Sequence, residues 1–138
     1  MTRATFHMRN DPADVDRAVV ALKCHVANAL GTAGLFRFEL SLAEALANVV
    51  KHATTSAPDA PVVIEFEVTR DAVQVEICDP IGAAPFDLRD HAHPLESIDL
   101  LAEEGRGLGL ILNATDHMDY RRKADRMCLF LTFLKSKD

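Results

Sequence analysis

Alternating and helical patterns of apolar residues divide the chain into strands and helices. Residues 4–8 alternate between apolar and polar side chains, which predicts a short first strand. Residues 10–12 (Asn-Asp-Pro) combine a capping side chain with a proline suited to a first helical turn, and residues 15–30 are apolar at helical spacing. We therefore expect a first helix that ends at Gly31, and a second helix over roughly residues 36–53.

Two further alternating segments predict a β-hairpin in the middle of the chain. A loop rich in Thr, Ser and Pro, residues 54–61, comes before them. Apolar side chains occupy every second position of residues 64–68 and of residues 73–77, and a tight turn at Arg70-Asp71 joins the two strands. Each strand has one apolar and one polar face, so helices should cover this part of the sheet on one side only.

Periodicity is lost after the hairpin and returns near residue 108. Residues 80–104 carry prolines at positions 80, 85 and 94, and a loop of this length in a small domain usually has a function, such as a lid. A helix starting at Leu108 and strands at residues 117–122 and 127–134 complete the predicted fold, a single α+β domain over residues 1–138.

The final strand is apolar on both faces. Leu129 and Leu131 lie on one face, and Cys128 and Phe130 lie on the other. Two explanations stay open: a second copy of the chain covers one face, which would make a homodimer, or both faces are buried in the core.

Composition and charge limit the classes of function. The chain has 138 residues, enough for one hydrophobic core, and its 49% apolar and 26% charged residues are typical of a soluble globular protein. The formal net charge of -6 argues against direct nucleic-acid binding and against attraction to an acidic membrane. A small anionic ligand is still possible, because it needs only local hydrogen-bond donors.

Three cysteines, Cys24, Cys78 and Cys128, lie far apart in apolar segments. Their odd number and wide spacing predict reduced core residues rather than disulfide partners or zinc ligands. The sequence shows no signal peptide and no apolar run of membrane-spanning length, so the expected location is the reducing cytoplasm.

The second predicted helix carries candidate chemistry. Glu44, Asn48 and His52 are spaced four residues apart and share one face. An amphipathic helix with an ordinary solvated side explains this spacing too. The functional explanation is that Glu44 is a potential base and that the Asn48 oxygen, together with phosphate oxygens, suits Mg²⁺.

Three glycines, Gly105, Gly107 and Gly109, mark the start of the last predicted helix. Glycines let backbone N–H groups approach an anion, and a helix N-terminus adds partial positive charge, so this segment is a candidate phosphate site, with Arg106 as a charged donor. The alternative is a glycine-rich helix start without a ligand. No Lys-Ser/Thr pair follows, so the segment is not a Walker loop.

Asp79 follows the second hairpin strand, where its carboxylate can accept a hydrogen bond from an exocyclic amine such as that of adenine. A turn-initiating aspartate before Pro80 explains the residue as well. His91 and His93 have the spacing of a metal-binding pair, but plain surface histidines in an acidic loop account for them equally simply.

In order along the chain, Glu44-x-x-x-Asn48, Asp79 to Gly82 and Gly105-Arg-Gly-Leu-Gly109 resemble the motifs of the GHKL (Bergerat-fold) superfamily of ATP-binding domains. The resemblance covers nearly the whole chain and is closest to the small bacterial anti-sigma-factor serine/threonine kinases. It implies a two-layer α/β sandwich whose mixed, mostly antiparallel sheet is covered on one face by about three helices. It also implies an ATP lid over residues 80–105.

The resemblance implies roles for individual residues. Asn48 would bind Mg²⁺, Asp79 would contact the adenine amine, and Glu44 would be the general base that takes the proton from a substrate hydroxyl. The remaining expected ATP contacts are His52, Gly82, Gly105, Arg106, Gly107, Leu108, Gly109 and Thr132.

The implied function is that of an ATP- and Mg²⁺-dependent serine/threonine kinase in a partner-switching pathway. It would phosphorylate a STAS-type anti-anti-sigma protein and sequester a sigma factor or another effector. The family pattern Asp-x-Gly-x-Gly is altered here: the segment from Asp79 to Gly82 is one residue longer, and Ala84 stands where a glycine is expected. This departure leaves open a non-catalytic, nucleotide-sensing anti-sigma or adaptor module that binds partners without phosphoryl transfer.

Overall fold

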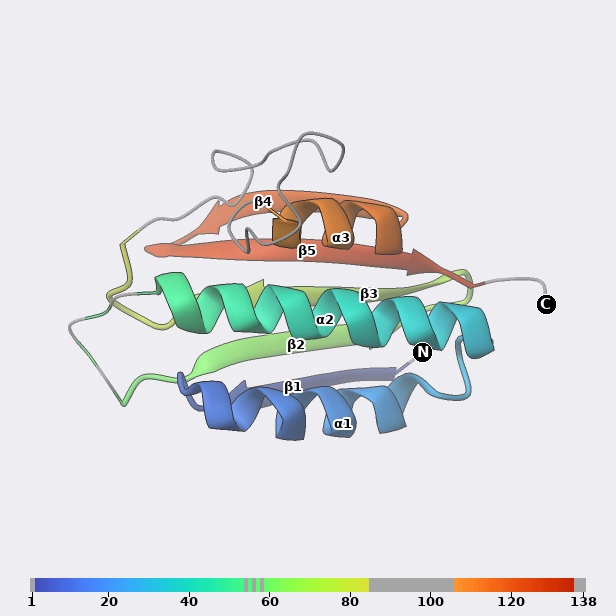
Figure 1. Cartoon of the computed structure of the whole chain (residues 1–138), viewed down its shortest axis with the longest axis horizontal. Helices are drawn as coiled ribbons and strands as arrows, with labels where there is room; N and C mark the ends of the chain where they lie inside the picture. The colour runs from blue at the N-terminus through green and yellow to red at the C-terminus, as the bar shows by residue number, and fades with distance from the viewer. Residues whose placement is uncertain (1, 54, 56, 58, 85–105, 136–138) are drawn as a thin grey trace.

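A computed structural model of the protein describes residues 2–53, 55, 57, 59–84 and 106–135 (Figure 1). The elements follow one another in this order: β1 (Thr2–Met8), a short 3-10 helix η1 (Pro12–Asp14), α1 (Val15–Val26), α2 (Thr32–His52), β2 (Val62–Val68), β3 (Ala72–Cys78), α3 (Arg106–Ala114), β4 (His117–Lys123) and β5 (Arg126–Leu134). Most of the predicted lid, residues 85–105, with His91, His93 and Gly105, lies outside the described residues.

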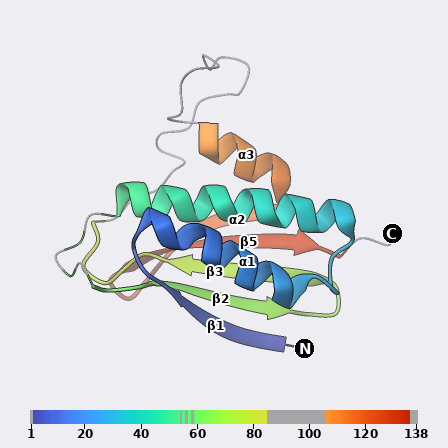
Figure 2. The same cartoon turned by 60° about the horizontal axis from the view of Figure 1, so that its bottom comes forward.

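The strands form one five-stranded sheet in the order β1-β2-β3-β5-β4. All four strand pairs are antiparallel, so the described part of the sheet has no parallel pair, where a mixed sheet was expected. Helices α1, α2 and α3 lie on one face of the sheet, and none of the helices that the structure describes lies on the other, which we call the face without helices (Figures 1 and 2). The predicted two-layer α+β architecture is confirmed.

The hydrophobic core fills the space between the helices and the sheet. Every second residue of each inner strand points toward the helices, as the period-two patterns predicted, and Ile64, Ile77 and Leu131 are almost completely buried there. Phe38 of α2 meets Phe133 of β5 edge to face, with ring centroids 5.1 Å apart. The central helix α2 is therefore fixed against strands that come from both halves of the chain.

The helix boundaries differ from the predicted ones around Gly31. Helix α1 ends at Val26, and Gly31 is the extended N-cap of α2 rather than the end of the first helix. Leu30 is buried although it lies in the connecting turn, so its helical spacing reflects packing against the core rather than membership of α1. The apolar spacing therefore extends beyond Val26, the last residue of α1, because Leu30 in the following turn is buried as well.

The two faces of β5 have different environments. Leu129, Leu131 and Phe133 are buried against the helices. On the face without helices, the ring of Phe130 is covered by Arg121, whose guanidinium carbon lies 4.5 Å from the ring centroid. One apolar face thus belongs to the core, and a cation–π contact from β4 shields the aromatic ring on the other.

Asp14 is a buried charge that joins the end of β1 to α1. Its carboxylate accepts hydrogen bonds from the backbone N–H of Arg9 and from Nη2 of Arg17, each at 2.8 Å, and its side chain is 2% exposed. The hydrogen bond from Arg17, followed by the one from the Arg9 backbone, holds the pKa of Asp14 well below its usual range.

Replacing Asp14 by asparagine is expected to make stability less dependent on pH in acid. A depressed pKa in the folded state contributes stability that is present above the unfolded value near 3.9 and is lost as the pH falls toward the folded value. Urea unfolding at pH 7, 4 and 3 measures the free energy of unfolding. This free energy should be lower for Asp14→Asn than for the wild type at pH 7, and the difference should be smaller at pH 3. Asp16→Asn, at an exposed position of the same helix, serves as the control; parallel pH curves for Asp14→Asn and the wild type would contradict the expectation.

Candidate functional site

A small pocket lies between the C-terminal half of α2 and the helix-covered face of the sheet. Its volume is about 20 Å³. Its lining residues come from α2, from the end of β3 and from β4 and β5: Ala45, Asn48, Val49, His52, Ala53, Asp79, Tyr120 and Leu129. Three of the residues singled out in the sequence, Asn48, His52 and Asp79, are therefore brought together from segments about 30 residues apart.

Asn48 presents an unsatisfied amide nitrogen to this pocket. It lies one helical turn before His52, so the two side chains share the face of α2 that looks toward Asp79. The side-chain nitrogen of Asn48 is buried and has no hydrogen-bond partner among the described residues. A buried polar group without a partner is costly, and a ligand that binds in the pocket can supply the missing partner.

Asp79 is held at the pocket by the pairing of β3 with β5. Its backbone N–H donates to the carbonyl of Met127 at 3.0 Å, one residue beyond the last strand pair of β3. Burial raises the pKa of Asp79 to about 6, and the positive charge of Arg126 opposes this shift. The carboxylate is thus largely ionised at neutral pH but poorly solvated, so it is a strong acceptor for a donor group on a ligand.

The segment after Asp79 forms a tight turn. The backbone N–H of Ala83 donates to the carbonyl of Pro80 at 3.2 Å, and Gly82 has a φ of 85°. A positive φ at the third position of such a turn favours glycine, which explains why Gly82 stands there. The Thr55 hydroxyl donates to the carbonyl of Ile81 at 2.5 Å and ties this turn to the segment after α2.

Glu44 lies one helical turn before Asn48, and its side chain is half-buried. It does not line the pocket itself. The structure therefore places Glu44 beside the group of Asn48, His52 and Asp79 on the same helix face, rather than within it.

The glycine motif lies partly inside a helix. Helix α3 begins at Arg106, two residues earlier than predicted, so Gly107 and Gly109 belong to its first turn and not to a preceding loop. Gly105 lies outside the described residues, and for Arg106 and Leu108 only the backbone is described. The first N–H groups of α3 have no partners within the helix, which is the feature that suits a phosphate.

Thr132 is not brought to this pocket. It pairs with Gln74 of β3 and with His117 of β4, and its side chain points to the face of the sheet without helices. It lines a separate hollow of about 280 Å³, with Glu76, Arg121 and Phe130 among its neighbours. Strand alternation places Leu129, which sequence reasoning did not select, on the pocket side instead.

The prediction of three reduced core cysteines is wrong. Cys78 and Cys128 stand directly opposite each other on β3 and β5 and form a disulfide, and Cys24 is exposed on α1. Only the strand register brings the two cysteines together, because 50 residues separate them in the chain. With Glu76 they form the group of potential metal ligands found in the described part of the chain, on the sheet face opposite Asn48.

A comparison with known protein families finds a match that includes the pocket residues. The histidine kinase-like ATPase domain matches residues 8–133. The chain belongs to this family. The match includes α2, Asp79 and the first turn of α3, and family membership implies that this histidine kinase-like ATPase domain binds ATP. No curated protein matches the chain.

The pocket residues of this histidine kinase-like ATPase domain fit a nucleotide. A buried amide nitrogen that lacks a hydrogen-bond partner within the described part of the chain and a poorly solvated carboxylate stand among apolar walls, which is the usual composition of a ligand site. The present volume is far below the roughly 300 Å³ of small-molecule pockets, so binding requires the surrounding residues to move apart. Within the described ranges, no helix is long and apolar enough to cross a membrane.

Proposed function

We propose that the protein is an ATP- and Mg²⁺-dependent serine/threonine protein kinase and anti-sigma factor of a partner-switching pathway. Its substrate would be a STAS-type anti-anti-sigma protein, and its second partner a sigma factor or another effector. The observation that carries the proposal is the convergence of Asn48 and Asp79 on one pocket with a carboxylate, Glu44, one helical turn away.

The proposed division of labour follows from the chemistry of these side chains. Asp79 accepts a hydrogen bond from the adenine amine, and the first turn of α3 binds phosphate oxygens. The side-chain oxygen of Asn48 would hold Mg²⁺, which would neutralise phosphate charge. Glu44 takes the proton of a substrate hydroxyl while the oxygen of that hydroxyl attacks the γ-phosphorus of ATP. The bond between the γ-phosphorus and the oxygen that bridges it to the β-phosphate breaks, and ADP is released.

Phosphoryl transfer is the direct test. The protein is incubated with radiolabelled ATP, Mg²⁺ and a STAS-type partner, and the partner is then hydrolysed and its phosphoamino acids are separated. We expect phosphoserine or phosphothreonine that disappears when EDTA removes Mg²⁺. ATP binding without any transfer to such partners would reject the kinase and favour the second candidate.

The second candidate is a non-catalytic, nucleotide-sensing anti-sigma or adaptor module. The turn after Asp79 favours it, because the Ala83–Pro80 hydrogen bond and the Thr55 contact restrain a segment that would hinge a lid. Such a module should bind its partner with an affinity that changes between ATP and ADP, while Glu44→Gln leaves that binding unchanged.

We also propose a cytoplasmic location and a homodimer without direct contacts to nucleic acid or membrane. The net charge of -6 supports the absence of nucleic-acid and acidic-membrane binding. Light scattering on the purified protein tests the dimer.

A further inference from the structure

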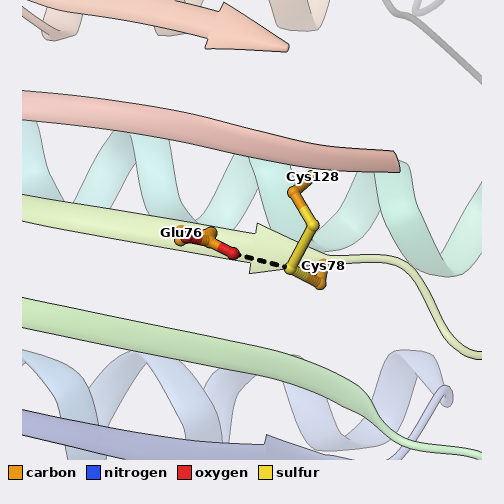
Figure 3. A group of neighbouring side chains, drawn as sticks. All are labelled: Glu76, Cys78 and Cys128. Atoms are coloured by element: carbon orange, nitrogen blue, oxygen red, sulfur yellow. Dashed lines mark hydrogen bonds between the residues drawn. A yellow bond between two sulfur atoms is a disulfide. The ribbon is translucent and has the colours of Figure 1, made fainter. Parts of the chain in front are cut away.

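The disulfide between Cys78 and Cys128 joins β3 to β5 (Figure 3). It lies directly behind the proposed nucleotide pocket. Cys78 ends β3, and the next residue, Asp79, lines the pocket; Cys128 precedes Leu129, which also lines it. Neighbouring residues of a strand point to opposite faces, so the cysteines occupy the face without helices while the two pocket residues face α2. The cross-link therefore joins the two strands at the point where each contributes to the pocket.

Strand register brings Cys78 and Cys128 directly opposite each other. The Cα atoms of Cys78 and Cys128 are 4.1 Å apart, and the flanking backbone hydrogen bond from Asp79 to Met127 is intact. The Cys128 residue is fully buried and the Cys78 residue is 7% exposed, so an external thiol reaches Cys78 more easily.

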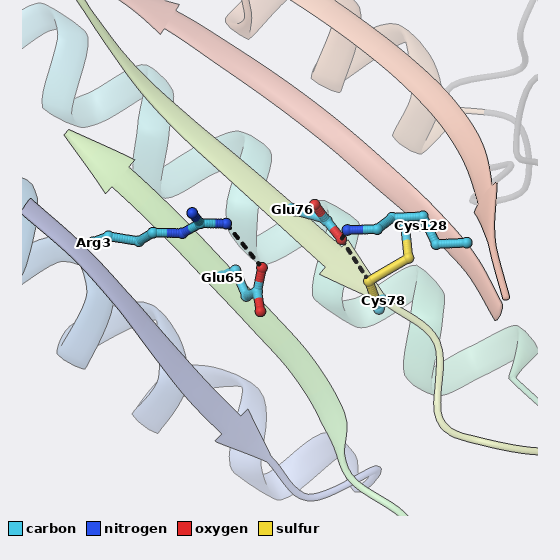
Figure 4. The surroundings of a disulfide bond; sticks show 6 residues. Arg3, Glu65, Glu76, Cys78 and Cys128 are labelled. Carbon is cyan, nitrogen blue, oxygen red and sulfur yellow. Dashed lines mark hydrogen bonds and ion pairs between the residues drawn. A yellow bond between two sulfur atoms is a disulfide. The ribbon is translucent and has the colours of Figure 1, made fainter. Parts of the chain in front are cut away.

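Glu76 lies beside Cys78 on the same face of the sheet (Figure 4). Its Oε1 atom lies 3.1 Å from the Sγ of Cys78 and 2.9 Å from the Nζ of Lys123. A thiol at Cys78 can donate a hydrogen bond to this carboxylate, whereas a disulfide sulfur has no proton to donate. Glu76 therefore stabilises the dithiol relative to the disulfide and makes the bond easier to reduce.

A bound metal ion fits the same group less well. Glu76, Cys78 and Cys128 offer three ligand atoms within 4.8 Å of one another. However, the ammonium group of Lys123 already pairs with Oε1 of Glu76 at 2.9 Å, so a metal cation held there would meet its positive charge.

We propose that Cys78 and Cys128 form a reversible dithiol–disulfide site that controls the order of the nucleotide pocket. The regulatory part rests on the ATP site of the proposed function. In the disulfide form, Asp79 and Leu129 are held together from behind. In the dithiol form, the end of β3 is free to fray. Nucleotide binding must then order Asp79, and the free-energy cost of this ordering lowers the affinity.

The co-reactant is a small thiol–disulfide couple such as glutathione. One glutathione thiolate attacks the Sγ of Cys78, the S–S bond breaks, and Cys128 leaves as a thiolate that takes a proton. A second glutathione attacks the mixed disulfide, releases the Cys78 thiolate, which is protonated, and forms glutathione disulfide. Two electrons pass from two glutathiones to the protein, and oxidation follows the same steps in reverse.

Counting free thiols tests the pair without any nucleotide. The Cys24→Ser protein, which retains only Cys78 and Cys128, is equilibrated natively with glutathione buffers from reducing to oxidising, quenched with acid, and labelled with a maleimide for mass spectrometry. We expect two labels in reducing buffer and none in oxidising buffer. Glu76→Ala should shift the half-oxidation point by about threefold to tenfold toward more reducing buffer, because the thiol loses its acceptor.

Two results of that titration would overturn the proposal. A disulfide that native protein retains in excess glutathione would be a permanent structural bond. Thiols that stay reduced in excess glutathione disulfide, or that low Zn²⁺ concentrations protect from labelling, would show an unreactive pair or a metal site.

Pocket order is measured in the two redox forms of the same protein. Hydrogen exchange at the amides of residues 79 and 81–84 should be faster in the dithiol form, and ATP should bind about threefold to tenfold more tightly to the disulfide form. A protein with both Cys78→Ser and Cys128→Ser should lose both differences. Equal exchange in the two forms would overturn the control of the pocket, whereas normal redox and exchange behaviour without ATP binding in either form would reject the proposed function alone.

Discussion

Replacing Asp79 by asparagine is expected to weaken ATP binding by roughly 10- to 150-fold and, at neutral pH, to stabilise the protein. An amide cannot provide the charged acceptor that the adenine amine needs, and hydrogen bonds to charged groups contribute about 1.5–3 kcal/mol. Isothermal titration calorimetry at pH 7.5 measures the loss. Asp71→Asn, at an exposed position in the β2–β3 turn, is the matched control and should bind ATP normally.

The gain in stability follows from the direction of the pKa shift. Burial raises the pKa of Asp79 to about 6, so the folded state prefers the protonated form. A raised pKa of an acid contributes stability that is fully present below the unfolded value near 3.9 and is lost as the pH rises through 6. Asparagine carries no charge to desolvate. The free energy of unfolding of Asp79→Asn at pH 7.5 should therefore exceed that of the wild type by on the order of 1–2 kcal/mol.

The pH dependence separates a ligand-binding aspartate from a turn residue. In urea unfolding, the difference in the free energy of unfolding between Asp79→Asn and the wild type should shrink between pH 7.5 and pH 5. The ATP affinity of the wild type should fall below pH 6 as the carboxylate becomes protonated. A variant that is less stable at pH 7.5 and still binds ATP normally would identify Asp79 as a turn-forming residue and would remove it from the site.

Replacing Glu44 by glutamine is expected to slow phosphoryl transfer by about 10²- to 10⁴-fold, the usual contribution of a general base. Glutamine keeps the shape and helix propensity of the side chain but cannot accept the substrate proton. ATP affinity should change little, because Glu44 does not line the pocket. Single-turnover transfer to a STAS-type partner, together with calorimetry for ATP, measures both quantities.

Glu39→Gln is the control for the Glu44 variant. Glu39 lies on the same helix, and its carboxylate pairs with Lys23 of α1 at 2.9 Å on the surface, an interaction of little energetic weight. Its transfer rate should match that of the wild type. Equal rates for all three proteins would show that Glu44 is not the base, whereas loss of ATP binding in Glu44→Gln would assign it a structural role.

Local patterns predicted the elements well because each pattern depends on one segment and one buried face. The capping position is an example: the Asp11 side chain accepts a hydrogen bond from the backbone N–H of Ala13 at 2.9 Å, where the Asn-Asp-Pro segment predicted a helix start. The capped element is the 3-10 helix η1, and α1 follows it from Val15 without a side-chain cap. The common face of Asn48 and His52 likewise follows from helical geometry alone.

The errors arose where the outcome depends on strand pairing. Neither the disulfide nor the role of Leu129 can be deduced before β3 is known to lie beside β5, and that pairing joins segments 50 residues apart. The position of Thr132 on the face away from the pocket could, however, have been deduced from the sequence. It shares its parity with Cys128 and Phe130, so alternation already assigned it to the face opposite Leu129 and Leu131.

The outer strand β4 also determines how copies of this protein can meet. It is an edge of the sheet, and its last three residues, Arg121, Arg122 and Lys123, are all exposed and positively charged. In a two-fold β4–β4 pairing centred near Arg122, the positive side chains of the two strands would meet, and like charges at a sheet edge are one means by which natural sheets resist edge-to-edge association. Self-association through continuous β-structure is therefore disfavoured in that register of this edge.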